Sequence, residues 1–217
     1  MRLPAPFTCA TSKLMSLPKI VQTGKTVLRV PASPVTPEQI GSPELKRLVA
    51  TMIKVMRAAP GVGLAAPQLG VPLQILVMED KESLMTKLSP DQRAQRGRVP
   101  FPLTVLFNPE LSPVGDSEYT FFEGCLSVSG FSALVPRKSA VQVRGLDESG
   151  TPACIDAEGW PARIFQHEID HLKGVLYIDR MLSRSFCINE EAAHWLLKPV
   201  DEVKRAFGIF DSFNTKG

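Results

Sequence analysis

Gln166-His167-Glu168-Ile169-Asp170-His171 places two histidines four positions apart, with a glutamate directly after the first. Pro161 upstream and Gly174 downstream are typical of helix ends, so a helix is predicted over 161–172. At 3.6 residues per turn both imidazoles project from one face of that helix, where they can share a metal ion. Glu168 can then take a proton from water on that ion and deliver it to a leaving amine. The alternative is a histidine-bearing amphipathic helix that binds no metal.

A third ligand is needed, because catalytic sites of this kind usually combine three protein ligands with one open position. In one class of metalloproteases the third ligand is a further histidine. This chain has Tyr177 at the position of that histidine, which disfavours the class. Proteases whose third metal ligand is a downstream glutamate are a closer match, because Glu190 or Glu191 could be that ligand. The third candidate is Cys125, which follows an apolar run and Gly124 and whose thiolate could reach a metal. Without a metal, an isolated cysteine of this kind is usually an inert buried residue.

Short strands and two further helical regions are predicted around this motif. Ser42-Pro43-Glu44 is a helix start, and apolar residues then recur at helical spacing to about residue 59. Region 190–207 is predicted to be helical with an interruption at Pro199. Strands are expected at 73–78, 103–107, 119–122, 140–144 and 152–155. The pattern lacks βαβ alternation, so we expect an α+β fold of mostly antiparallel strands around the central helix, with an N-terminal helix and a C-terminal helical tail.

Three other segments are predicted to lie outside these strands and helices of the core. Residues 1–35 are punctuated by proline, serine and threonine. The glycines of 60–70 would let backbone approach a ligand closely, although a plain turn has the same composition. The polar link 81–100 suits a solvated helix or a surface excursion better than core.

The composition is that of an ordinary globular protein: 217 residues, 44% hydrophobic and 22% charged. The net charge of +3 is too small and dispersed to indicate a nucleic-acid or membrane surface, and no apolar run is long enough to span a bilayer. Four cysteines without paired spacing favour a reducing compartment. The first acidic residue is Glu38, so 1–17 is expected to be a leader or an organellar presequence and 18–217 a single catalytic domain.

Three stretches of this sequence together resemble the signature motifs of the peptide deformylase family. They are GVGLAAPQ at 61–68, EGCLS at 123–127 and QHEIDHLKG at 166–174, in the family's order and spacing. The resemblance extends over roughly 18–185, and the link 81–100 is similar to that of organellar-type members. The stretch Gly24-Lys25-Thr26-Val27-Leu28 departs from the family, which usually has an acidic residue or histidine before Pro-Val-Leu.

The resemblance implies one divalent ion held by Cys125, His167 and His171. In this family the ion is typically Fe²⁺, with Zn²⁺, Ni²⁺ or Co²⁺ able to replace it. Glu168 would act as general base and then as acid. The side-chain amide of Gln68 and the backbone N–H of Leu126 would stabilise the oxyanion.

The implied substrate is N-formylmethionine at the start of nascent polypeptides, from which the enzyme would release formate. Gly61, Val62 and Gly63 would let the peptide backbone lie close. Val62, Trp160 and Ile164 would line an apolar pocket for the methionine side chain, and a tight cavity at the metal would exclude acetyl groups. The expected partners are formylmethionyl peptides and, transiently, the ribosome, without nucleic-acid recognition or membrane association.

The expected location is the cytoplasm for a bacterial protein and the mitochondrion or plastid for a eukaryotic one, the latter being favoured.

Glu123 and Arg137 are candidates for an ion pair near the metal loop, unless they are two unrelated surface charges. Two other functions stay open from the residues themselves. A glutamate-liganded protease would cleave internal peptide bonds, and a ribosome-associated binding module would need a fourth ligand to close a structural metal site.

Overall fold

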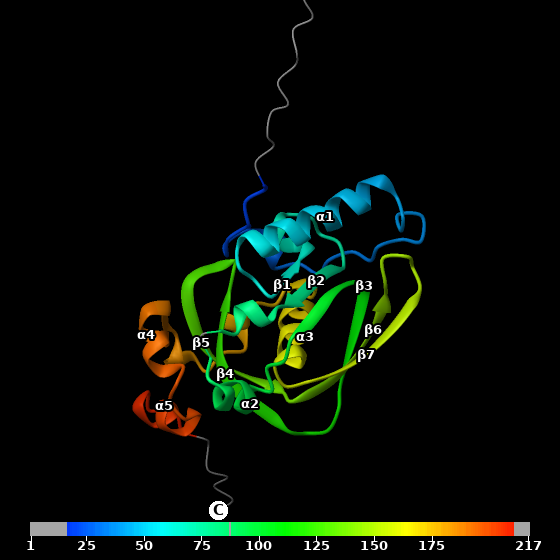
Figure 1. Ribbon diagram of the computed structural model, residues 1–217. Coiled ribbons are helices and arrows are strands. Elements are labelled where there is room, and N and C mark those ends of the chain that lie inside the picture. Colours follow the sequence, from blue (N-terminus) through cyan, green and yellow to red (C-terminus); the bar gives the residue numbers. More distant parts are fainter. Residues whose placement is uncertain (1–16, 87, 211–217) are drawn as a thin grey trace, which may run out of the picture.

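The computed structural model describes residues 17–86 and 88–210, and it contains two antiparallel sheets with a helix between them (Figure 1). Nearly all of the expected leader lies outside the described residues. One sheet has the order β1-β2-β3-β6-β7, formed by Gly63–Ala65, Ile75–Asp80, Phe101–Pro113, Ala140–Leu146 and Pro152–Glu158. The other has the order β4-β5-β8, formed by Glu118–Cys125, Val128–Lys138 and Cys187–Ile188. All these strand pairs are antiparallel, so the predicted α+β class with antiparallel strands is confirmed.

Helix α1 (Pro43–Ala58) covers one face of the five-stranded sheet. The Ser42 hydroxyl accepts a hydrogen bond from the Leu45 N–H at 3.2 Å, which caps the helix as the sequence predicts. Strand β2 is buried on both sides because alternate side chains point to opposite faces. Ile75 and Val77 pack toward α1, whereas Leu76 and Met78 belong to the core cluster of the opposite face.

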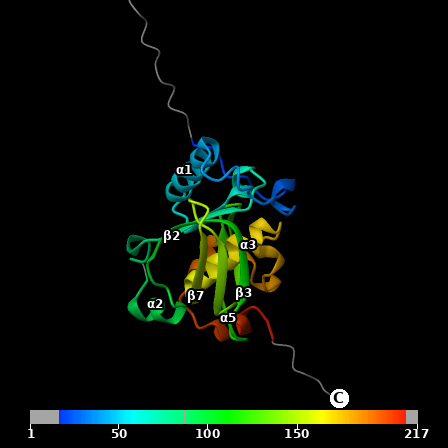
Figure 2. The ribbon, with the colours of Figure 1, turned by 90° about the vertical axis from the view of Figure 1, so that its right-hand side faces the viewer.

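Helix α3 (Gly159–Leu172) carries the two histidines and lies against that opposite face, along strands β3 and β7 in Figure 2. It also contacts β5 of the smaller sheet. The helix begins at Gly159, two residues before the predicted start at Pro161. Gly174 follows its C-cap in the left-handed region, at a φ of 74°, and its N–H donates to the His171 carbonyl at 3.2 Å.

Replacing Gly174 by alanine is expected to lower the free energy of unfolding by about 2 kcal/mol or more. The left-handed backbone disfavours a side chain, and an added Cβ would lie 2.7 Å from the Arg29 carbonyl carbon. Gly115→Ala is a matched control, because its φ of 72° imposes the same strain while nothing lies within 4 Å of its Cβ. Urea unfolding measures both, and equal losses in the two variants would contradict this packing argument.

Two short helices follow β8: α4 (Asn189–Trp195) and α5 (Val200–Ala206). The predicted interruption at Pro199 is confirmed. In Figure 1 both helices lie beside strands β4 and β5. Ala192 and Val203 pack there against Phe122 and Leu134, which anchors this tail to the smaller sheet.

The sequence prediction is wrong in three places. Segment 60–70 contains strand β1 as well as a turn of 3-10 helix (Ala66–Leu69). Strand β5 was not predicted, because serine, glycine and proline interrupt its apolar pattern. The polar link contains a helix, α2 (Pro90–Arg96), which was one of its two predicted forms, but it is not wholly solvated, since Met85 and Arg96 are buried. In the described part of the chain, no helix combines the length and the apolar character that a bilayer crossing requires.

Candidate metal centre and active site

Cys125, His167 and His171 come together between the two sheets. Cys125 ends strand β4, and both histidines lie on α3. The Cys125 Sγ lies 3.2 Å from Nε2 of His171, and the possible ligand atoms of all three residues lie within 4.8 Å of one another. This is the one group of three such residues that the described ranges bring together.

The donor atoms suit a first-row divalent metal ion. One thiolate and two imidazoles are ligands that zinc and Fe²⁺ accept, and three ligands leave a position open for water. Nδ1 of His171 is buried and has no hydrogen-bond partner among the described residues. Burial lowers the pKa of His171 well below its ordinary value, which favours the neutral form that binds metals.

The rival ligands Glu190 and Glu191 do not join this group. Both are exposed in the first turn of α4. The place of the absent third histidine is taken by Tyr177, whose hydroxyl donates to the Phe131 carbonyl at 3.0 Å and which packs in the core. The geometry therefore favours Cys125 over the glutamates as the third ligand.

Glu123 fixes the orientation of His167. Its Oε2 lies 3.0 Å from Nδ1 of the imidazole, which leaves Nε2 for a metal. Arg137 donates two hydrogen bonds of 2.9 Å to the same carboxylate, and Arg163 donates one of 2.6 Å. Burial favours the neutral form of Glu123, but the charge of Arg137 and the hydrogen bond from His167 hold its pKa far below the ordinary value. The proposed pairing of Glu123 with Arg137 is present, and it is buried instead of superficial.

The network continues from Arg137 to the surface. Asp170 accepts a hydrogen bond from Arg137 and two from Arg180, at 2.6 and 2.7 Å. Asp170 directly precedes His171 on α3, about 100° around the helix axis, and its carboxylate is bound by Arg137 and Arg180. The buried arginine thus joins α3 to strand β4 through ion pairs on both sides.

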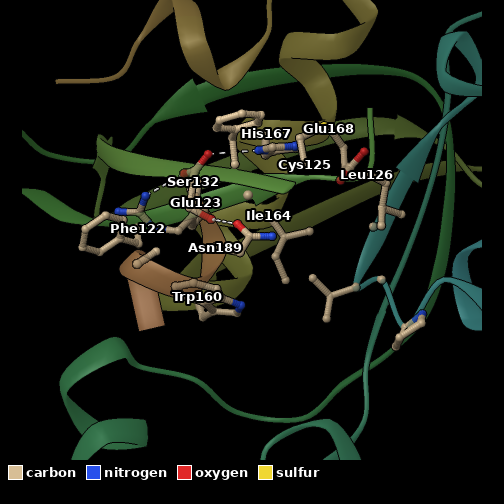
Figure 3. A pocket seen from close by; sticks show the side chains of 18 of the residues that line it. Phe122, Glu123, Cys125, Leu126, Ser132, Trp160, Ile164, His167, Glu168 and Asn189 are labelled. Atoms are coloured by element: carbon tan, nitrogen blue, oxygen red, sulfur yellow. Dashed lines mark hydrogen bonds and ion pairs between the residues drawn. The ribbon is translucent and has the colours of Figure 1, made fainter. Parts of the chain in front are cut away.

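Glu168 lies beside the three candidate ligands and faces the cavity, as Figure 3 shows. It is 4% exposed, and its Oε2 has no hydrogen-bond partner in the described ranges. Burial, aided by the negative charge of Glu123, raises the pKa of Glu168 to about 7. A carboxylate in this state can both accept and return a proton near neutral pH.

Gly63 leaves the space that the Glu168 side chain fills. A Cβ added to Gly63 would lie 2.3 Å from Oε1 and 2.7 Å from Cδ of that carboxylate. Gly63→Ala should therefore push the carboxylate aside and lower kcat about 100-fold, the loss typical of a misplaced catalytic group. Substrate turnover measures the rate, while metal content and thermal unfolding serve as controls. A variant with the parent kcat would contradict this reading of the contact.

Gln68 joins the β1 loop to the metal loop. Its Oε1 accepts from the Ala65 N–H at 2.8 Å, and its Nε2 donates to the Ser127 hydroxyl at 3.3 Å. Nε2 also lies 3.7 Å from the Cys125 Sγ. The fixed carbonyl end thus directs the amide N–H group toward the candidate metal site.

A cavity of about 410 Å³ opens beside these groups. The sequence-predicted site residues that line it are Gly61, Val62, Gly63, Gln68, Cys125, Leu126, Trp160, Ile164, His167 and Glu168. His171 lies behind this lining and is 1% exposed. All the predicted site residues are therefore brought to one place.

The sequence analysis missed the wall that helix α4 contributes. Asn189, Ala192 and Leu196 line the cavity. The Asn189 side chain accepts a hydrogen bond from the Ser132 hydroxyl at 2.7 Å (Figure 3). No sequence motif marks these residues, because they reach the cavity only through the packing of α4 on the smaller sheet.

Helix α3 presents a buried glutamate and two imidazoles, and strand β4 ends in a cysteine beside them, next to a cavity. This arrangement is typical of single-metal hydrolases. The family model for polypeptide deformylase matches residues 17–186, and the chain belongs to that family. The predicted family resemblance is therefore confirmed.

Named relatives support this assignment. The chain is 52% identical to the human mitochondrial peptide deformylase over 167 residues, covering 77% of this chain and 69% of the human protein. It is 48% identical over 174 residues to the chloroplastic peptide deformylase 1A of Solanum lycopersicum, covering 80% of this chain and 63% of that protein. A Met-Ala-Ser-bound class I type b peptide deformylase from Acinetobacter baumannii has the same fold, with a TM-score of 0.68 and 29% identity over 76% of this chain and 99% of that one.

Proposed function

We propose that this protein is a metal-dependent hydrolase that removes the formyl group from N-formylmethionyl peptides and releases formate. The observation that carries the proposal is the meeting of Cys125, His167 and His171 beside the buried Glu168 in one cavity. Residues 18–217 would form one catalytic domain, preceded by a leader at 1–17.

Cys125, His167 and His171 would hold one divalent ion, with Fe²⁺ as the native metal and Zn²⁺, Ni²⁺ or Co²⁺ as substitutes. Such an ion acidifies water and polarises the formyl oxygen. The donor set supports this range of metals, since a thiolate with two imidazoles suits each of them.

Glu168 would accept a proton from the attacking water, because its raised pKa lies near neutral pH. The water oxygen adds to the formyl carbon, and the proton then passes from Glu168 to the amine as the carbon–nitrogen bond breaks. The products are formate and a free methionyl amine.

Gln68 and Leu126 would stabilise the negative charge that develops on the formyl oxygen. The Gln68 N–H group makes long contacts, of 3.3 and 3.7 Å, which a shorter hydrogen bond to the formyl oxygen would replace. Leu126 directly follows Cys125 and lines the cavity, so its backbone N–H would supply the second donor. Loss of one such donor typically costs about 100- to 1,000-fold in rate.

The substrate backbone would lie along Gly61, Val62 and Gly63. Among the described residues strand β1 pairs with β2 alone and ends the sheet, so its other edge would accept an extended peptide. The methionine side chain would enter the pocket formed by Val62, Trp160 and Ile164, and the small space at the metal would reject an acetyl group by steric clash. The Met-Ala-Ser peptide bound to the Acinetobacter relative supports a peptide in this cavity.

The nascent chain at the ribosome is the proposed source of substrate, without nucleic-acid recognition or membrane association. Relatives named mitochondrial and chloroplastic support an organelle as the location, although a bacterial relative shares the fold. In a bacterium the location would be the cytoplasm.

Mass spectrometry of the products tests the proposal against the protease alternative. Anaerobically purified, metal-loaded protein is incubated with formyl-Met-Ala-Ser and, separately, with acetyl-Met-Ala-Ser. Loss of the formyl group alone, with the acetyl peptide intact, supports the proposal. Cleavage at an internal peptide bond, or no product at all, would reject it.

A further inference from the structure

The end of the polar link, Arg96-Gly97-Arg98, packs against the first turn of α3. The Gly97 carbonyl accepts a hydrogen bond from the backbone N–H of Trp160 at 3.3 Å. A Cβ on Gly97 would lie 3.1 Å from Cα of Gly159, and one on Gly159 would lie 2.8 Å from the Gly97 oxygen. Two facing glycines thus let the link touch the helix backbone directly beside Trp160.

Arg98 holds the indole of Trp160. Its guanidinium donates to the buried carboxylate of Asp80 at 2.8 and 3.0 Å, and its Cζ lies 5.3 Å from the centroid of the Trp160 ring. The Cζ of Arg163 lies 5.9 Å from the same ring, and Arg163 is itself bound to Glu123. Both distances are within the range of cation–π attraction, so the ring is fixed by two anchored cations.

Arg96 holds a second residue that lines the cavity, Leu196. Arg96 is 6% exposed, and its Nη2 donates to the Leu196 carbonyl at 2.5 Å. Its Nη1 bonds the Gln92 carbonyl at 3.1 Å, and its Cζ lies 5.5 Å from the Phe121 ring. Leu196 follows the last turn of α4 and lines the cavity together with Trp160.

We propose that Arg98 and Arg96 are positioning residues that set the width of the methionine pocket by holding Trp160 and Leu196. This proposal rests on the proposed function, because it concerns the side chain that the same site would bind. Neither arginine lines the cavity, so each acts through the residue that it holds. Arg93 on the same link differs, since it pairs with Glu82 at the surface.

A pocket wall of this kind affects binding more than chemistry. The methionine side chain is bound equally in the ground state and the transition state, so a looser wall raises KM and leaves kcat unchanged. The attraction of one cation to one indole corresponds to about a 3- to 30-fold change in affinity. A wider pocket should also accept formyl-Phe-Ala-Ser better relative to formyl-Met-Ala-Ser.

Tryptophan fluorescence gives a readout that does not depend on activity. The chain has two tryptophans, and Trp195 packs on Phe207 outside the catalytic cavity, so Trp195→Phe leaves Trp160 as the sole emitter. In this background Arg98→Ala is expected to red-shift the emission and increase acrylamide quenching. It should also raise KM about 3- to 30-fold at constant kcat and lower the preference for formyl-Met over formyl-Phe.

Arg93→Ala is the matched control and is expected to keep the emission and KM of the parent. The double variant Asp80→Asn with Arg98→Met leaves no unpaired buried charge, so it provides the test if Arg98→Ala does not fold. Arg96→Met should raise KM without changing Trp160 emission, because Arg96 holds Leu196.

Parent-like emission and KM in the folded Arg98 variants would overturn the proposal, as would a loss confined to kcat. An unchanged KM in Arg96→Met would remove Arg96 from it. If the parent releases no formate, the proposed function fails, while the emission of the Arg98 variants still shows whether this residue holds the indole.

Discussion

Cys125→Ala is expected to abolish metal binding and formate release together. The thiolate is the only non-histidine donor in the cluster, and two imidazoles alone leave the ion half-liganded. Loss of a group that merely supports a ligand typically costs 10- to 100-fold in metal affinity, so we expect loss of the ligand to exceed about 100-fold. Equilibrium dialysis against Co²⁺ measures the affinity, and formate release measures the activity.

Cys154→Ala is the matched control, because Cys154 is exposed on strand β7. It is expected to bind metal and release formate as the parent does. Retention of both properties by Cys125→Ala would show that the ion has a different third ligand, and Glu190 and Glu191 would then be the residues to replace.

Glu168→Gln is expected to lower kcat by about 100- to 10,000-fold while the protein keeps its metal. The amide has nearly the same shape as the carboxylate but cannot accept the proton of the attacking water. Folding should not suffer, because burial favours the neutral form of this side chain. Metal content by elemental analysis and single-turnover formate release separate the two properties.

Glu110→Gln, at an exposed position of β3, controls for the change in charge. Loss of metal from Glu168→Gln would show that Glu168 is a ligand instead of a base. A parent-like kcat would place the proton transfer on another group.

The candidate metal centre was predictable from the sequence because its chemistry is concentrated in local spacing. His167 and His171 are one helical turn apart, so their shared face follows from helix geometry alone. Cys125 required the family resemblance, since a lone cysteine after a strand has no such geometric constraint. The pairing of Glu123 with Arg137 was inferred from charge alone, since the register of β4 and β5 places Ala133 opposite Glu123 and Tyr119 opposite Arg137.

The cavity walls were less predictable because they depend on tertiary packing. Asn189 and Leu196 reach the site only after α4 packs on β4 and β5, which are far away in sequence. Arg96 is in a polar segment whose pattern indicates solvent, yet its charge is buried against a backbone carbonyl and an aromatic ring. Strand β5 was missed for a related reason, since its pairing with β4 outweighs a poor local strand pattern.

Anaerobic titration of the metal-free protein with Fe²⁺ tests the central claim most directly, with formate release from formyl-Met-Ala-Ser as the signal. The three converging ligands predict that the metal-free protein is inactive and that activity rises linearly to a break at one ion per chain. Full activity without metal, or no formate release after one ion has bound, would contradict the proposed metal-dependent deformylase.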